Sequence, residues 1–432
     1  MDQVTYIGLT NYQNKHIRFG IKEKERSGHI YCIGKTGVGK STLLLNMAIS
    51  DIQNGSGVGI IDPHGDIAES ILDHIPKERI KDVIYFNPSD AQFPIAFNPL
   101  SCVSEHERHI VASSLIATFK KIWADSWGPR LEHIFRNAIL SLLHYPSATV
   151  LDIQPLLTDS DFRSEVMHYL KDAALRNFWY KEFNPLSPQM KHEAVSPIIN
   201  KIGLFQTHPL IRNIVAQPES SFSVADIQNS KKIFIANLSK GVLGEDGTQL
   251  LGSMLVTQFQ TAALGRATQS VQSRFPFYLY IDECASFVTL SFADMLSESR
   301  KYGLCLFLTH QYMYQLHDEI RNAILGNVGT VISFRVGAPD AKVLEQEFTP
   351  VFSAEDLVSL PQYHMYIKLL IDGTTSRPFS AKSLLLAEVK QSHKQEIIAA
   401  SRKAYAREWK IFQQEINAPK QVSKVSATLF DV

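Results

Sequence analysis

Short apolar runs bounded by turn residues recur along the chain at spacings typical of buried strands. Most of these runs are apolar nearly throughout, as expected for strands that are covered on both faces. Segments with helical spacing lie between several of them, including 40–53, 66–75, 291–302 and 340–348. This alternation predicts an α/β fold with a mostly parallel sheet. The predicted strands are 29–34, 57–63, 82–88, 231–238, 276–283, 304–311, 330–337 and 365–372.

The pattern changes in the second quarter of the chain. Strand-like runs disappear there, and "SSLIATFKKIW" (113–123) and "RLEHIFRNAILSLLHY" (130–145) repeat their apolar residues at helical spacing. We therefore expect an all-α domain inserted into the sheet domain. A long polar helix is expected over 383–416, followed by a mobile tail. The predicted parts are 1–100 and 226–380 for the sheet domain, 101–225 for the all-α domain, and 381–432 for the C-terminal helix and tail.

The overall composition narrows the class of protein. Of the 432 residues, 45% are hydrophobic and 20% charged, which describes a globular protein with a large core. The 43 basic and 43 acidic residues balance, so any contact with nucleic acid depends on local patches. The 4 cysteines are too widely spaced for a zinc ribbon. No apolar run reaches the roughly 18 residues of a membrane span, and we expect a cytoplasmic protein.

The segment "GKTGVGKST" carries the most specific motif. Gly34 to Ser41 match the pattern G-x-x-x-x-G-K-[ST], between a predicted strand and a predicted helix. Glycines let backbone N–H groups turn toward phosphate oxygens, Lys40 reaches the β- and γ-phosphates, and the Ser41 hydroxyl ligates Mg²⁺. The motif predicts a site for ATP and Mg²⁺. The predicted nucleotide-binding residues are Gly34, Lys35, Thr36, Gly37, Val38, Gly39, Lys40, Ser41 and Thr42.

Two later strands end in polar residues suited to phosphate chemistry. "YLYIDE" ends in Asp282 and Glu283, and "LFLTHQ" ends in Gln311. A carboxylate at the tip of a buried strand can hold Mg²⁺ through its water, and an adjacent Glu can polarise the attacking water. The Gln311 amide can sense the γ-phosphate or hold that water. These residues predict hydrolysis, with Asp282 as a metal ligand and Glu283 and Gln311 as catalytic residues.

Two further motifs leave alternatives open. Arg300 in "SESRKYG" is either a solvated helix residue or an arginine finger that a subunit supplies to its neighbour's γ-phosphate. Asp62, His64 and Asp66 in "IIDPHGD" follow a predicted strand, at the sheet edge where ligands bind. No second His lies at ligand spacing, which favours a hydrogen-bonded structural role or a contact with the nucleotide site over a metal site.

The segment "FKKIWADSWGPR" (119–130) combines cations with aromatic residues. Its cations Lys120, Lys121 and Arg130 would suit phosphate contact, and Trp123 and Trp127 would suit base stacking. An amphipathic helix with buried tryptophans and solvated lysines is the favoured alternative.

Taken in this order, the motifs resemble those of the HerA/FtsK superfamily of P-loop ATPases. Within it they are most similar to the TraD/TraG-type coupling proteins of conjugative type IV secretion. The resemblance covers roughly residues 25–375 and rests on "GKTGVGKST", "IIDPHGD", "FNPL", "WGPRLEHIFRNA", "YLYIDECASF", "ESRKYG" and "LTHQY".

The resemblance implies a RecA-like core interrupted by an all-α domain, and a homohexameric ring with nucleotide between subunits. DNA, the implied partner, would be driven through the ring. Lys40 and Ser41 match the Walker A positions, and Asp282 and Glu283 match the Walker B pair.

The resemblance also implies roles for two more residues. Arg300 falls where coupling proteins carry their trans-acting arginine, with Arg321 and Arg335 as competitors. Gln311 falls at the glutamine that is linked to the γ-phosphate.

Coupling proteins of this type usually carry amino-terminal transmembrane helices, and this sequence shows none. A separately encoded membrane partner, a soluble translocase or a fragment would each account for that difference. If a separately encoded membrane partner exists, it would recruit this protein to the inner face of the cell membrane. A relaxase or the secretion channel would then be a further partner. The alternative functions are a HerA-like translocase in DNA-end processing, a secretion or pilus-assembly ATPase that moves protein, and a nucleotide-dependent scaffold.

Overall fold

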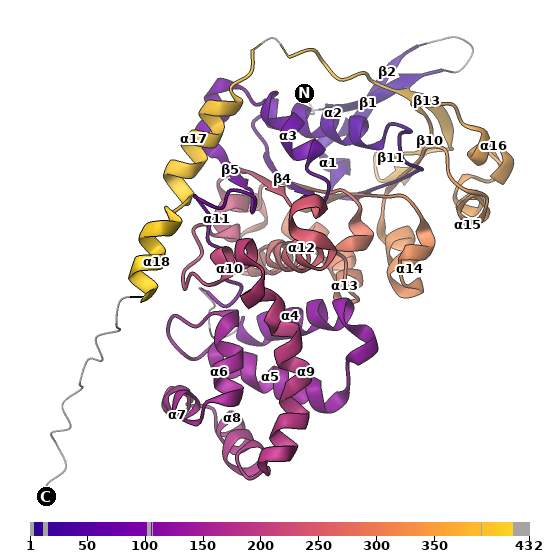
Figure 1. The fold of residues 1–432 in the computed structure, drawn as a ribbon. Helices are drawn as coiled ribbons and strands as arrows, with labels where there is room; N and C mark the ends of the chain where they lie inside the picture. Colours follow the sequence, from indigo (N-terminus) through magenta and orange to yellow (C-terminus); the bar gives the residue numbers. More distant parts are fainter. Residues whose placement is uncertain (1–3, 12–15, 102–104, 106, 390, 418–432) are drawn as a thin grey trace, which may run out of the picture.

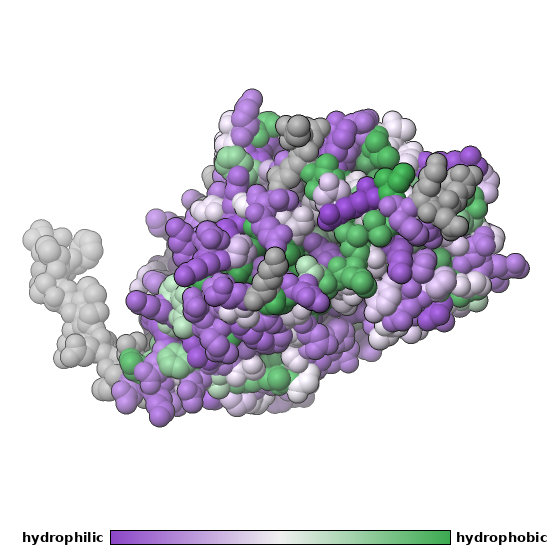
Figure 2. All heavy atoms as spheres, turned by 90° about the horizontal axis from the view of Figure 1, so that it is seen from above, coloured by the Kyte–Doolittle hydropathy of each residue, from purple (hydrophilic) through white to green (hydrophobic). Residues whose placement is uncertain are grey.

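A computed structural model describes residues 4–11, 16–101, 105, 107–389 and 391–417. One sheet of 11 strands forms its centre, in the order β2-β1-β13-β10-β9-β3-β8-β7-β4-β6-β5. Helices flank this sheet, and a group of helices extends away from it in the lower half of Figure 1. Seen from above, hydrophilic residues cover most of the visible face, with hydrophobic patches between them (Figure 2). The predicted α/β class with a mostly parallel sheet is confirmed.

The strands from β9 to β5 in this order are parallel and carry the predicted motifs. Every residue in them is buried, which explains why their sequences are apolar nearly throughout. They are β3 (Ile30–Ile33), β4 (Gly57–Asp62), β5 (Val83–Phe86), β6 (Ile233–Asn237), β7 (Phe277–Ile281), β8 (Leu304–His310) and β9 (Thr330–Ser333).

The other end of the sheet is antiparallel, and most of it is missing from the sequence-based expectation. It consists of β1 (Val4–Thr10), β2 (Arg18–Lys22), β10 (His364–Lys368) and β13 (Phe379–Ser383). Only β10 was expected, within 365–372. The rest of that run forms β11 (Leu370–Ile371), which pairs with β12 (Thr374–Thr375) in a separate small sheet.

The two faces of the sheet pack against different sets of helices. Ile30 and Cys32 of β3 belong to one hydrophobic cluster, and the alternate residues Tyr31 and Ile33 belong to the other. The first cluster includes residues of α2 (Lys40–Gln53) and α3 (Asp66–Leu72). The second includes residues of α12 (Lys240–Gly265), α13 (Ser291–Glu298), α14 (Asp318–Asn327), α15 (Ala338–Phe348) and α16 (Ala354–Ser359).

A buried ion pair connects the helix after the phosphate loop with the strand that carries the acidic pair. Arg26 of the short helix α1 (Glu23–Arg26) lies 2.9 Å from Asp51 of α2, and both side chains are 2% exposed. The Tyr280 hydroxyl of β7 donates to the same carboxylate, and Thr5 of β1 donates to its other oxygen. Because both Asp51 oxygens accept hydrogen bonds, the cost of burying this ion pair is offset. The same hydrogen bonds fix α2 against β7.

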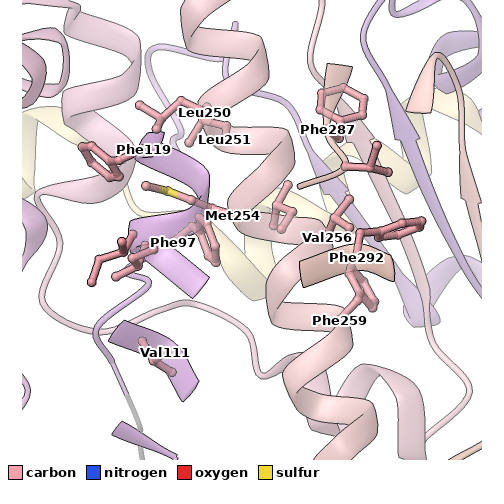
Figure 3. Close-up of a cluster of buried hydrophobic side chains, with 14 of the residues drawn as sticks. Phe97, Val111, Phe119, Leu250, Leu251, Met254, Val256, Phe259, Phe287 and Phe292 are labelled. Atoms are coloured by element: carbon pink, nitrogen blue, oxygen red, sulfur yellow. The ribbon is translucent and has the colours of Figure 1, made fainter. Parts of the chain in front are cut away.

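Between β5 and β6 the described residues form helices and loops. The apolar core of this segment is continuous with the hydrophobic cluster on one face of the sheet. Figure 3 shows the junction, where Met254 and Leu250 of α12 face Phe119 of the segment. Its helices are α4 (Arg108–Ile122), α5 (Pro129–Leu142), α6 (Ile153–Thr158), α7 (Ser160–His168), α8 (Ala173–Asn177), α9 (Pro188–Thr207), α10 (Pro209–Val215) and α11 (Val224–Asn229).

The expected single helix over 383–416 is wrong in its extent. Residues 384–389 and 391–393 are not helical, and two helices follow, α17 (Lys394–Tyr405) and α18 (Trp409–Asn417). The chain must cross from β13 to the far edge strand β5, where α17 packs. The strands β13 and β5 lie eight strand spacings of about 4.8 Å apart. Ten helical residues would span only about 15 Å, so the segment that connects β13 to α17 must be extended. The predicted mobile tail lies outside the described residues.

Candidate active site

The predicted site residues gather at the carboxyl edge of four neighbouring strands. The phosphate loop follows β3, Gln311 follows β8, and Asp282 and Glu283 follow β7, while Asp62 ends β4. The strand order β3-β8-β7-β4 makes these ends adjacent. They enclose a cavity of about 420 Å³ lined by Thr36, Gly37, Gly39, Lys40, Ser41, Thr42, His64, Asp66, Asp282, Glu283, Gln311, Gln362 and Tyr363.

The phosphate loop has the backbone shape that its glycines permit. Gly37 and Gly39 have φ angles of 75° and 118°, a region that side chains disfavour. A Cβ on Gly39 would also lie 2.9 Å from the Tyr363 ring. Gly39 is the residue before the first turn of α2, and the N–H groups of that turn lack acceptors within the helix. The loop therefore offers a set of donors that fits phosphate.

Lys40 is held over this loop in the structure. Its ammonium donates to the carbonyls of Gly34 at 2.7 Å and Lys35 at 3.1 Å, and the residue is 6% exposed. The remaining predicted residue, Val38, is 1% exposed and packs into the core below the loop. Gly34, Lys35 and Val38 thus shape the loop, whereas the other predicted nucleotide-binding residues line the cavity.

Asp282 is a buried carboxylate with a partner on the next strand. It is 4% exposed, and Thr309 Oγ1 of β8 donates to its Oδ1. Burial raises its pKa to about 6, with the nearby charges of Glu283 and Asp62 acting in the same direction. A divalent cation in the cavity would offset this cost, and the Ser41 hydroxyl lines the same space.

The donor set fits Mg²⁺ better than a transition metal. Within the described residues, no group of three or more His, Cys, Asp or Glu side chains could hold a metal ion. A site with one carboxylate, one hydroxyl and space for phosphate is typical of Mg²⁺, which keeps several waters and shares its ligands with a nucleotide.

Gln311 connects the phosphate loop with Glu283. Its Oε1 accepts a hydrogen bond from Thr36 Oγ1 at 2.8 Å, and its Nε2 donates to Glu283 Oε1 at 2.7 Å. Glu283 has a left-handed backbone, with φ 46° and ψ 53°, which a non-glycine residue adopts only at a cost. The surrounding structure therefore holds Glu283 in a defined position at the rim of the cavity.

The motif "IIDPHGD" divides into structural and cavity residues. Asp62 accepts hydrogen bonds from the backbone N–H groups of His64 at 2.8 Å and Ala68 at 2.9 Å, so its carboxylate holds the start of α3. His64 and Asp66 are exposed and line the cavity. This arrangement agrees with the structural role and nucleotide-site contact that the sequence favoured.

Three residues of the site escaped the sequence analysis. Thr309 supports Asp282, Gln362 Nε2 donates to the carbonyl of Gly37 at 2.8 Å, and the N–H of Tyr363 donates to the carbonyl of Val38 at 2.9 Å. Thr309 and His310 are the two polar residues that end an otherwise apolar strand, which is a usable signal. Gln362 and Tyr363 lie in a loop before β10, and nothing in their sequence links them to a site more than 300 residues earlier.

Arg300 does not belong to this cavity. It lies in the turn Ser299–Tyr302 before β8, whereas Gln311 follows that strand, so the two occupy opposite edges of the sheet. The seven residues of β8 separate them by about 23 Å. Arg300 is exposed, and within the described residues its guanidinium makes no hydrogen bond or ion pair.

The competing arginines lie elsewhere. Arg321 on α14 is paired with Asp318 at 3.1 Å. Arg335 follows β9, and its carbonyl accepts from the N–H of Lys35 at 2.9 Å, which places it beside its own phosphate loop.

Two of the three cations in the segment 119–130 have partners. Lys121 donates to the carbonyl of Ala285 at 2.9 Å, and Lys120 lies 3.5 Å from Glu132, whereas Arg130 is exposed. Trp123 and Trp127 are half-buried against the core, as the favoured alternative expected in part. That alternative is wrong in two respects, because α4 ends at Ile122, before both tryptophans, and Lys121 is turned inward rather than solvated.

Solved structures of similar fold are conjugation and secretion proteins. The bacterial conjugative coupling protein TrwB in its unbound form is 16% identical, with a TM-score of 0.62 over 86% of this chain and 89% of that one. TrwB in complex with the non-hydrolysable ATP analogue ADPNP gives 16% identity and a TM-score of 0.63, covering 85% and 88%. VirB4 of Thermoanaerobacter pseudethanolicus gives 14% identity and a TM-score of 0.58, covering 88% and 96%. These likenesses support the RecA-like P-loop fold.

No curated protein sequence matches the chain significantly. None of the helices in the described part of the chain is long and apolar enough to cross a membrane. The family model for the type IV secretion-system coupling protein DNA-binding domain matches residues 16–348, from β2 through the phosphate loop, the helical segment and Gln311 to the end of α15. The chain therefore belongs to the family of type IV secretion-system coupling proteins.

Proposed function

We propose that this protein is an ATP- and Mg²⁺-dependent motor that moves DNA as a coupling protein of type IV secretion. One observation carries the proposal. The phosphate loop, the buried Asp282 and the pair Glu283–Gln311 line a single cavity, in a chain whose family is defined by a DNA-binding domain.

The residues of the cavity divide the work of hydrolysis. The N–H groups of residues 34–42 and the Lys40 ammonium bind the phosphates. Ser41 and Asp282 would hold Mg²⁺, which would supply positive charge to offset the charge that develops on the phosphate oxygens. Glu283 accepts the proton of the attacking water, and its strained backbone keeps the carboxylate at the rim of the cavity.

Gln311 connects binding with hydrolysis. In the structure its amide is shared between Thr36 of the phosphate loop and Glu283. A γ-phosphate beside the loop competes for these same groups, since both the Gln311 amide and the Thr36 hydroxyl are polar and reach the cavity. Binding of ATP thereby releases Glu283 to act on water.

Arg300 completes the site of a neighbouring subunit. It cannot reach its own cavity, because it lies at the opposite edge of the sheet, and it is exposed without a partner among the described residues. In a ring, the sheet edge that carries the cavity of one subunit can face the sheet edge that carries Arg300 of the next subunit. Such a ring brings Arg300 to its neighbour's cavity. We assign this assembly as a homohexamer from the family resemblance.

The helical segment is the proposed contact with DNA or with a relaxase. We treat 101–225 as an inserted all-α domain, 1–100 and 226–380 as the motor, and 381–432 as the C-terminal part. The core of the segment is continuous with that of the motor, so a force on its helices reaches the strands that carry the site. Recruitment to the inner face of the membrane by a partner belongs to the same proposal.

The test is the rate of ATP hydrolysis by the purified chain against protein concentration, without DNA and with single- or double-stranded DNA. We expect the rate per subunit to rise with concentration, because each site needs a neighbour, and to rise further with DNA. The variant Glu283→Gln should bind ATP normally and lose turnover.

Two results would contradict the proposal. A rate that neither concentration nor DNA changes, in a protein that forms rings, would favour a motor for protein cargo. Normal function of Glu283→Gln in DNA transfer would favour a scaffold that binds ATP without using its hydrolysis.

A further inference from the structure

Three basic residues from other parts of the chain contact the turn that carries Arg300 or the helix end just before it. His29 donates to a carbonyl in the last turn of α13, and the two arginines donate to carbonyls at the end of the Arg300 turn. His29 Nε2 bonds the carbonyl of Leu296 at 3.1 Å, Arg274 bonds that of Lys301 at 2.9 Å, and Arg266 bonds that of Tyr302 at 3.0 Å.

His29 is the most constrained of the three. It is 1% exposed and precedes β3 with a left-handed φ of 58°. Its Nδ1 accepts from the backbone N–H of Leu306 at 3.1 Å, so the ring proton lies on Nε2 and is directed at Leu296. The same Nε2 lies 3.3 Å from the hydroxyl of Ser299, the residue before Arg300. Both ring nitrogens of a neutral histidine are therefore used.

Arg266 and Arg274 hold the other end of the turn. Arg266 is 1% exposed and bonds the carbonyl of Phe275 at 3.1 Å as well as that of Tyr302. Arg274 bonds Gln269 at 2.8 Å, and its guanidinium lies 5.3 Å from the centre of the Tyr302 ring. These contacts tie the turn to the end of α12 and to the loop before β7.

We propose that His29, Arg266 and Arg274 are positioning residues that fix the backbone of the Arg300 turn, so that its guanidinium is presented in a preformed orientation to the neighbouring subunit. The inference rests on the proposed role of Arg300 in trans. A finger on a loose turn would have to order its backbone on each encounter with ATP, whereas this turn is ordered beforehand. His29 further connects the turn to β3, the strand whose other end opens into the subunit's own phosphate loop.

The experiment separates the subunit that gives an arginine from the one that receives it. Lys40→Ala has no site of its own but keeps Arg300, and Arg300→Ala keeps its site but lacks the finger. Each alone should hydrolyse ATP at background. A one-to-one mixture with DNA should recover about a quarter of the wild-type rate, since a random ring pairs the intact halves at that frequency.

His29→Asn is then added to one partner at a time. Asn tolerates the left-handed backbone of residue 29, but its side chain is too short to make both contacts. In the Lys40→Ala partner, which gives the finger, we expect it to reduce the recovered rate at least about tenfold. In the Arg300→Ala partner, which receives the finger, the rate should stay within about twofold.

Arg274→Ala provides a second variant at a partly exposed position, in case residue 29 tolerates no change. It should show the same asymmetry between the two partners, and Arg176→Ala on the exposed face of α8 should show no effect in either. An equal loss in both partners, or no loss in either, would overturn the positioning role while leaving Arg300 in trans intact. Failure of the unmodified mixture to recover any activity would instead overturn the proposed role of Arg300.

Discussion

At the scale of single residues, the site depends on a short chain of polar contacts. Thr36, Gln311 and Glu283 are connected by hydrogen bonds of 2.8 and 2.7 Å, so the side chain that would activate water is held by the loop that would bind phosphate. In the proposed mechanism, this arrangement keeps Glu283 inactive until a nucleotide changes the contacts of Gln311.

Replacement of Gln311 by Ala tests this relation. We expect kcat to fall by about 10²–10³, because the group that orients water is lost, with little change in ATP affinity. Steady-state kinetics and the Kd of a fluorescent ATP analogue measure the two effects. Thr36→Val is the matched control, since it removes only the contact with the loop, and it should leave kcat within about threefold. An equal loss of kcat in both variants, or a loss of ATP affinity without a loss of kcat in Gln311→Ala, would contradict the assignment.

Two buried histidines make the fold sensitive to acid. His29 and His310 are neutral in the structure, and burial lowers the pKa of each to about 4. Between about pH 6.5 and pH 4 the unfolded chain binds protons that the folded chain refuses, so stability is lost as the pH falls through this range. Each histidine should cost about 2 kcal/mol at pH 5.

Urea unfolding of the wild type, His29→Asn and His310→Asn at pH 7.5 and pH 5.0 measures this cost. Each variant should lose less free energy of unfolding on acidification than the wild type does. A loss as large as that of the wild type in both variants would place the acid sensitivity elsewhere.

At the scale of elements, the parallel strands and β10 could be predicted, whereas the other antiparallel strands could not. A strand covered on both faces, such as β4 or β8, is apolar nearly throughout and stands out from its surroundings. The hairpin β1–β2 and the strand β13 are half-exposed, and the hairpin joins the sheet only through the pairing of β1 with β13, hundreds of residues later in the chain. For the same reason Gln362 and Tyr363 were missed, because only the path of the chain brings their loop to the phosphate loop.

Helix α17 covers the open edge of the sheet. The N–H of Tyr85 in the edge strand β5 donates to Ser401 of α17 at 2.9 Å, and Lys232 donates to the Tyr405 hydroxyl at 2.8 Å. A chain that ends at Val389 should therefore expose β5 and self-associate. Size-exclusion chromatography and thermal unfolding measure this, with a chain that ends at Asn417 as the control. A monodisperse, equally stable shorter chain would contradict the role of α17 as an edge cover.

Lys121 connects the helical segment to the acidic pair. It donates from α4 to the carbonyl of Ala285, two residues after Glu283, and burial lowers its pKa to about 7. We expect Lys121→Met to reduce the stimulation of ATPase activity by DNA, because movement of α4 would no longer reach Glu283. The neighbouring variant Lys120→Met should retain full stimulation, since the partner of Lys120 among the described residues is Glu132 at the surface. Equal stimulation in both variants would exclude this route.

At the scale of the whole molecule, the proposed mechanism uses residues from opposite edges of one sheet. The carboxyl edge carries the phosphate loop and the acidic pair, and the other edge carries Arg300 on a turn whose Lys301 carbonyl accepts from Arg274. If Arg300 acts in trans as we propose, a subunit is complete only beside another copy of itself, and hydrolysis is then a property of the assembly. The phosphate loop and acidic pair could be identified from sequence motifs, but the clamp on the Arg300 turn could not, because its donors are distant residues without a motif.

The most direct test of the central claim is movement along DNA. The purified protein, ATP and Mg²⁺ are added to a duplex that carries a short triplex-forming strand at one end, and release of that strand is followed over time. Our account predicts release that requires ATP hydrolysis, that starts later on longer duplexes, and that is lost in Glu283→Gln and Arg300→Ala. Hydrolysis stimulated by DNA without any release of the strand would contradict it.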